Sequence, residues 1–127
     1  MTRVALISVV AYGLMLLLVG LAGIGLARWE LTHLFAVAPD ATFLNQYRFL
    51  KAVEMGSGVF CLVFCRDIIG NGRSTLPFLV LVAAGVVARS IAWVVDGRPS
   101  WPFTVFLVLE AVVLVLVILE LRRRRID

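Results

Sequence analysis

Four charged residues lie inside long apolar runs of the sequence, where charges are rare. Lys51 and Glu54 share one run, whereas Arg89 and Glu110 each lie in a separate one. At bilayer depth a charged side chain costs about 2.5 to 3.5 kcal/mol, so each of the four needs a partner or a water-filled cavity. Because two are positive and two are negative, they predict one neutral, buried ionic cluster.

The chemistry open to such a cluster is the binding of a polar or charged ligand headgroup, or the transfer of protons. Arg89 is the expected centre, because a planar guanidinium can bind two carboxylates at once. The same charges would equally serve as an interhelical clamp that fixes helix register and has no further role. Both hypotheses stay open, and we extend the predicted polar site to the flanking Arg48 and Asp96.

Motifs of established catalytic and metal-binding chemistry are missing from the sequence. It has no Ser-His-Asp combination, no HExxH spacing and no glycine-rich phosphate loop. Cys61 and Cys65 lie one helical turn apart, which suits neither a disulfide nor a zinc site, and the one histidine, His33, lies in another segment. An enzyme would have to use the intramembrane charges alone. We therefore favour a non-enzymatic protein with no metal site, and leave its cofactors open.

Four apolar runs must position these charges. They cover residues 4–27 and about 48–65, 76–95 and 102–121. About 20 residues at 1.5 Å each cross a hydrocarbon core of about 30 Å. The 62% hydrophobic content and mean hydropathy of +1.05 also lie far outside the range of soluble proteins. The sequence thus predicts a single all-α integral membrane domain over 1–127.

Basic residues that flank these runs predict the orientation in the membrane. Seven would lie on one side, namely Arg3, Arg66, Arg73 and Arg122 to Arg125, and three on the other, namely Arg28, Arg48 and Arg98. Because cytoplasmic flanks are enriched in Lys and Arg, we expect both termini in the cytoplasm. Short connections predict an antiparallel four-helix bundle. A basic tail after an apolar run also favours a membrane rim over a nucleic-acid surface.

The helical rise places three of the charges at a common depth. Measured from the outer ends of their runs, Glu54, Arg89 and Glu110 lie roughly 9 to 12 Å deep. We therefore expect the polar site in the outer half of the bundle. The inner half is expected to be apolar with a basic rim.

Glycines predict where the helices approach one another. They lie at Gly13, Gly20 and Gly23 in the first run, Gly56 and Gly58 in the second, and Gly85 in the third. In lipid, helices associate where small side chains let backbones come close, although glycine is also simply tolerated in membrane helices. The first helix has no charge and is expected to pack as support.

The longest connection joins the first two runs. Trp29, Leu31, Leu34 and Phe35, with polar residues between them, predict a short interfacial helix. Asp40 after Pro39 indicates that the second helix begins near Ala41.

Motifs spread over nearly the whole chain resemble a known family. They are Asn45-Gln-Tyr-Arg-Phe49, Gly56-x-Gly58, Gly85-x-x-x-Arg89-Ser90, Asp96-Gly-x-Pro99 and Glu110. The pattern resembles a bacterial family of small four-helix membrane proteins classified as a domain of unknown function, distantly similar to the DoxX-like proteins. The resemblance implies a fold and a bacterial inner (cytoplasmic) membrane, but no activity. DoxX-like members are associated with respiratory or redox complexes, which implies a subunit role.

Two functions follow as expectations. The first is a non-enzymatic accessory or assembly subunit that contacts the lipid bilayer and a larger membrane complex, or further copies of itself. The second is a binder or transporter of a small amphiphile or ion through the outer-half polar cluster. Nucleic acid is not expected as a partner.

Overall fold

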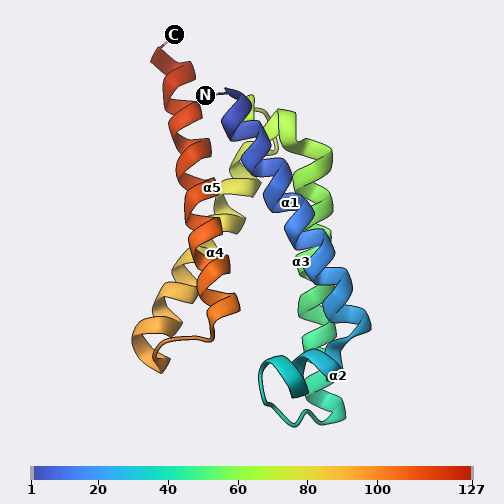
Figure 1. Ribbon diagram of the computed structural model, residues 1–127. Helices are drawn as coiled ribbons and strands as arrows, with labels where there is room; N and C mark the ends of the chain where they lie inside the picture. The colour runs from blue at the N-terminus through green and yellow to red at the C-terminus, as the bar shows by residue number, and fades with distance from the viewer. Residues whose placement is uncertain (1, 127) are drawn as a thin grey trace. The chain divides into compact units, whose positions relative to one another are not determined.

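The computed structural model describes residues 2–126, which are almost entirely helical (Figure 1). The long helices are α1 (Thr2–Gly25), α3 (Ala41–Ile69), α4 (Thr75–Asp96) and α5 (Trp101–Ile126). The short helix α2 (Ala27–Trp29) and the π-helical turn η1 (Glu30–Leu34) lie between α1 and α3. No β-strand occurs among the described residues, so the predicted all-α class is confirmed.

Among the described residues, three helices are long and apolar enough to cross a membrane, namely α1, α4 and α5. Even α4, with 22 residues, extends about 33 Å at 1.5 Å per residue. These helices support a multi-pass membrane protein. The 29-residue α3 contains the predicted span 48–65, but Lys51 and Glu54 interrupt its apolar stretch. A fourth crossing therefore stays a prediction.

The helices form two compact units. Residues 13–63 make up the first, which we call the α1–α3 unit. Residues 2–12 and 64–126 belong to the second, which we call the α4–α5 unit. The long helices α1 and α3 each contribute to both units.

Glycines bring α1 and α3 together in the α1–α3 unit. A Cβ atom added to Gly20 would lie 2.6 Å from the backbone nitrogen of Met55, and one added to Gly58 would lie 2.5 Å from that of Leu17. The expected packing role is thus confirmed at these two glycines. It is wrong for Gly56, which has open space where its Cβ would be.

The segment before α3 packs on the first turns of that helix. Ala27 and Leu31 form a small buried core with Leu44 of α3. The backbone N–H of Phe43 donates to Oδ1 of Asp40 at 2.7 Å, which caps α3 at its predicted start. A short helical segment therefore exists where the sequence predicted one.

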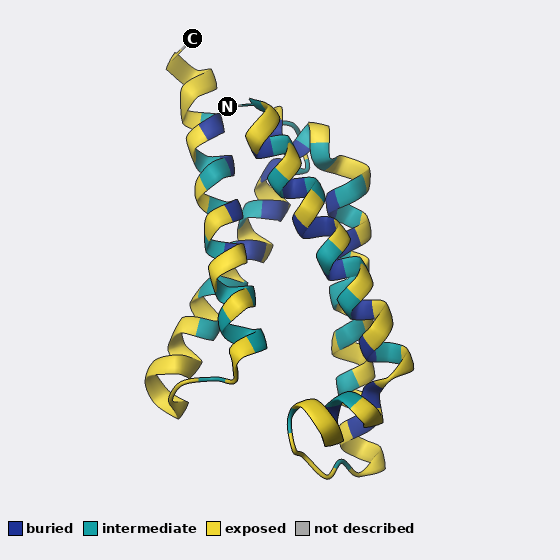
Figure 2. Cartoon of the chain, viewed as in Figure 1, coloured by how far each residue is buried: buried dark blue, intermediate teal, exposed yellow. Residues whose placement is uncertain are grey.

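In the α4–α5 unit, α4 and α5 pack against each other and share one apolar core (Figure 2). Phe78 and Val82 of α4 are buried there, as are Val113 and Val117 of α5. The spacing of four residues in each helix places each pair on one face. This packing holds α5 in register with α4, which determines which polar side chains can meet.

A turn stabilised by Asp67 joins α3 to α4. The backbone N–H of Ser74 donates to Oδ2 of Asp67 at 2.7 Å, and Thr75 Oγ1 donates to the carbonyl of Ile68 at 2.8 Å. The hydrogen bonds from Ser74 lower the pKa of the Asp67 carboxyl. A Cβ at Gly72 would clash with that carboxylate, so any other residue there would displace it from Ser74.

Candidate functional site

An ion pair between Arg89 of α4 and Glu110 of α5 is the centre of the candidate site. Nε of Arg89 donates to Oε2 of Glu110 at 3.0 Å. Glu110 is buried, with 5% of its surface exposed, whereas the Arg89 side chain is 31% exposed. The carboxylate is therefore shielded, while part of the guanidinium stays accessible.

Three elements hold this pair in place. The hydroxyl of Tyr12 in α1 lies 3.4 Å from Oε1 of Glu110. Gly85, one turn before Arg89, leaves room for the carboxylate, since a Cβ there would lie 3.4 Å from Oε2 of Glu110. The rings of Phe103 and Phe106 have their centroids 5.9 and 5.6 Å from Cζ of Arg89. Such cation–π contacts stabilise a guanidinium away from water.

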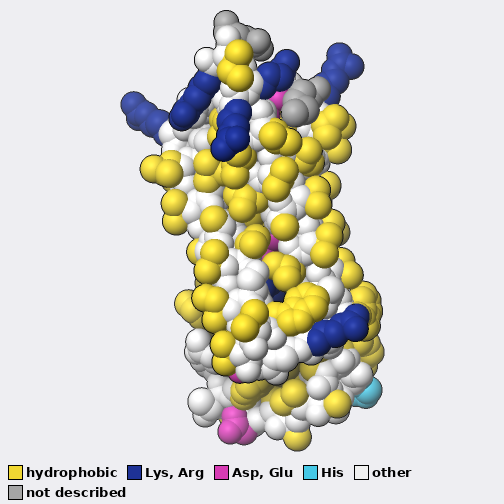
Figure 3. Space-filling view, turned by 90° about the vertical axis from the view of Figure 1, so that its left-hand side faces the viewer, with side chains coloured by type: hydrophobic (Ala, Val, Ile, Leu, Met, Phe, Trp, Pro, Cys, Tyr) yellow, Lys and Arg dark blue, Asp and Glu magenta, His cyan; other side chains and the backbone are white. Residues whose placement is uncertain are grey.

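A pocket of about 310 Å³ opens beside Arg89, where α4 ends and α5 begins. It is lined by Arg89, Ala92, Trp93, Asp96, Gly97, Arg98, Pro99, Phe103 and Leu107. Figure 3 shows one face of the molecule, on which small areas of charged side chain are visible between hydrophobic ones. The volume lies at the lower end of the range for small-molecule sites, which are mostly apolar with a few polar groups.

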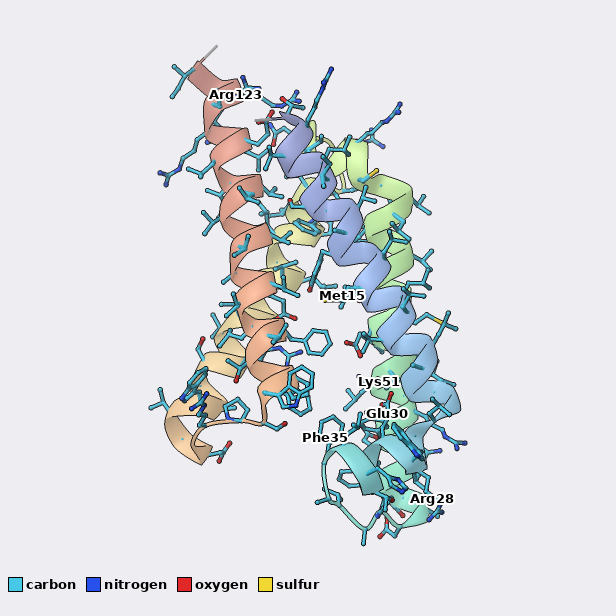
Figure 4. All side chains as sticks on the ribbon, in the orientation of Figure 1. Met15, Arg28, Glu30, Phe35, Lys51 and Arg123 are labelled. Carbon is cyan, nitrogen blue, oxygen red and sulfur yellow. The ribbon has the colours of Figure 1, made fainter. Side chains whose placement is uncertain are left out.

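The other two charges of the predicted cluster, Lys51 and Glu54, form a second ion pair in the α1–α3 unit. Nζ of Lys51 donates to Oε2 of Glu54 at 2.8 Å and lies 5.5 Å from the ring centroid of Tyr47. The Tyr47 hydroxyl in turn donates to Oε2 of Glu30 at 2.6 Å. Figure 4 labels Glu30 and Lys51, which lie on η1 and α3. Sequence reasoning did not assign Glu30 to the site.

The six predicted site residues are therefore distributed unevenly. Arg89 pairs with Glu110, and Asp96 lines the same pocket as Arg89. Lys51 and Glu54 belong to the α1–α3 unit, where Arg48 is exposed on α3. Among the described carboxylates, Glu110 is the one that Arg89 binds. A single cluster of four charges stays a prediction.

A polar network that the sequence analysis missed lies at the other end of the α4–α5 unit. Glu120 of α5 is fully buried, and its Oε1 accepts hydrogen bonds from Thr2 at 2.6 Å, Arg124 at 2.9 Å and Arg123 at 3.2 Å. Figure 4 labels Arg123 near the end of α5. The expectation of an apolar inner half with a basic rim thus needs a correction, since this end contains a buried acid. The spacing Glu120 to Arg123 and Arg124, three and four residues, was the available signal.

Comparison with known proteins identifies a family and no further relative. A family model described as "Domain of unknown function (DUF4345)" matches residues 2–121. No curated protein and no solved structure matches the chain. The match covers Arg89, Glu110 and all the residues that line the pocket.

Proposed function

This chain belongs to the family described as a domain of unknown function (DUF4345), and we propose that it binds a small amphiphile or ion in the pocket beside Arg89. The accompanying topology is the predicted antiparallel bundle of four spans in a bacterial inner membrane, with both termini in the cytoplasm. The excess of basic residues on one side supports that orientation. The pocket would then open at the outer end of the bundle.

The observation that supports binding is the contact of a charged side chain with an open pocket. An ion pair that serves only as a clamp is most effective when both of its charges are shielded from water, because water competes with the pair. Glu110 is sealed, but Arg89 is not, and it lines a pocket whose other walls are mainly apolar. This combination matches the usual composition of a small-molecule site.

Photolabelling in native membranes tests the proposal. A photoactivatable fatty acid should label peptides from the end of α4 and the start of α5. Leu107→Trp fills the pocket and should abolish this labelling. Val108→Trp introduces the same side chain at an exposed position outside the pocket lining and should leave the labelling unchanged. Equal labelling of all three proteins would refute the proposal.

An accessory or assembly subunit is the second candidate function. Ile91, Val94 and Val95 of α4 are all largely exposed, which leaves an apolar face for lipid or for another membrane protein. Purification in mild detergent followed by mass spectrometry should yield a stoichiometric partner or a homo-oligomer. A protein that migrates alone as a monomer would remove this candidate.

The proposed topology has its own test. Fusion of green fluorescent protein and of alkaline phosphatase to the C-terminus should give fluorescence in the first case and no phosphatase activity in the second. Active phosphatase would place the C-terminus outside.

A further inference from the structure

We infer that the pocket selects an oxyanion, a carboxylate or phosphate group attached to an apolar chain, and binds it through the guanidinium of Arg89. This inference rests on the proposed function and names its ligand class. Three features of the described residues support it, namely the donors that Arg89 leaves unused, the charges of the lining and the pocket size.

Arg89 uses one of its nitrogen atoms for Glu110. The bond involves Nε, and within residues 2–126 neither Nη1 nor Nη2 forms a hydrogen bond. A guanidinium has five N–H donors, four of them on the Nη atoms. The neighbouring Phe103 and Phe106 stabilise the positive charge by their ring faces but supply no strong acceptor. The unused donors are therefore available to an acceptor that enters the pocket.

Glu110 and the two rings also hold the guanidinium in a fixed orientation. Two N–H groups on one edge of a guanidinium match the two oxygens of a carboxylate or phosphate. Because these contacts within the chain already fix the guanidinium, little entropy is lost when the oxyanion binds. A preorganised fork of this kind favours an oxyanion over a neutral alcohol.

The charged residues around the pocket also favour a negatively charged ligand group. Arg89 and Arg98 line the pocket with one acid, Asp96, while the carboxylate of Glu110 is not part of the lining. With Glu110, which lies 3.0 Å from Arg89, the nearby charges sum to zero, but both positive groups face the pocket and one of the two acids does not, which favours an acceptor over a cation. Trp93, Pro99 and Leu107 provide apolar contact for the chain of an amphiphile.

The volume limits what can enter. About 310 Å³ equals roughly ten water molecules at about 30 Å³ each, enough for a headgroup and a short length of chain. The remainder of a longer chain would extend into the bilayer. The oxyanion could therefore belong to a free single-chain acid or to a membrane phospholipid.

Competition against the photoactivatable fatty acid tests the inference on the full-length protein. The competitors are dodecyl phosphate and dodecanol, which share one chain and differ in charge. For the unmodified protein, dodecyl phosphate should compete at about tenfold lower concentration or better, the effect of one charge-assisted hydrogen-bonded pair. Equal competition would overturn the inference while leaving the proposed function intact, whereas absence of labelling would refute the proposed function itself.

Matched variants assign the selectivity to Arg89. Arg89→Gln alone leaves a buried carboxylate and risks misfolding, so Arg89→Gln/Glu110→Gln removes the fork together with that charge. This double variant should lose the preference for phosphate, and Asp96→Asn should increase it. Arg28→Gln removes an exposed positive charge outside the pocket and should preserve it. A double variant that retained the preference would overturn the inference.

Nanodiscs distinguish the two sources of the oxyanion. Both phosphatidylglycerol and phosphatidylcholine contain a phosphate. The headgroup of phosphatidylglycerol has a net negative charge, whereas that of phosphatidylcholine is zwitterionic. If phosphatidylglycerol reduces labelling of the unmodified protein and not of the double variant, a lipid headgroup is the ligand. If only dodecyl phosphate does so, the ligand is a free amphiphile, and both results support the inference.

Discussion

Replacing Arg89 should lower the free energy of unfolding more than replacing Glu110, although both changes break the same ion pair. In Arg89→Gln the carboxylate of Glu110, a residue that is 5% exposed, keeps the Tyr12 hydroxyl at 3.4 Å as its hydrogen-bond partner among the described residues. An unpaired buried charge costs about 3 kcal/mol or more. In Glu110→Gln the guanidinium can still reach water through the pocket, because its side chain is 31% exposed. We expect Glu110→Gln to lower the free energy of unfolding by about 1 kcal/mol.

The double variant Arg89→Gln/Glu110→Gln should be more stable than Arg89→Gln alone. It removes the buried charge, so its effect on the free energy of unfolding should be smaller than the sum of the two single effects. The difference, the interaction energy, should be about 1 to 2 kcal/mol. Equilibrium unfolding in mild detergent, followed by tryptophan fluorescence, measures all three free energies of unfolding. Equal effects of the single variants, or strict additivity in the double variant, would refute the asymmetric burial on which the site depends.

Three further predictions concern the rest of the chain. Gly20→Ala should lower the free energy of unfolding by about 1 to 3 kcal/mol because its Cβ would meet the Met55 backbone, whereas Gly56→Ala, whose Cβ meets no atom, should raise it by about 0.5 to 1 kcal/mol in the same assay because alanine favours the helix. Because the folded pKa of Asp67 is lowered, its contribution is present above the unfolded pKa of about 3.9 and is lost as the pH falls below it. Asp67→Asn should therefore flatten the acid limb of a stability profile, and an unchanged limb would contradict the role of the turn. Glu120→Gln should lower the midpoint of thermal unfolding, since its Oε1 accepts three hydrogen bonds; an unchanged midpoint would show that the network contributes nothing.

Parts of the fold were predictable because their signals are local. Hydropathy over about 20 residues marks a membrane helix wherever that helix finally packs. This is why α1, α4 and α5 have the apolar character that their runs predicted. The cap of α3 was predictable for a similar reason, since Asp40 and Phe43 lie three residues apart.

The candidate site was only partly predictable. Gly85, Arg89 and Asp96 share one stripe of α4, and Glu110 was recognised as a costly charge in an apolar run. Its pairing with Arg89 was among the expected contacts. The Tyr12 hydroxyl was missed, because a tyrosine in an apolar helix gives no signal until the facing residue is known. Glu120 was missed because it lies at the end of its run beside Arg122 to Arg125, where a charged residue is expected to face water.

The sequence by itself determined an all-helical membrane protein, its glycine contacts in part, and the identity of the costly charges. These properties follow from composition and from periodicity along one helix. Only the tertiary structure decided that Arg89 of α4 pairs with Glu110 of α5 beside a pocket, whereas the Lys51–Glu54 pair joins residues three apart on one helix. The reason is physical: the sequence specifies which face of a helix is polar, but the rotation and distance between packed helices determine which charges come within 3 Å.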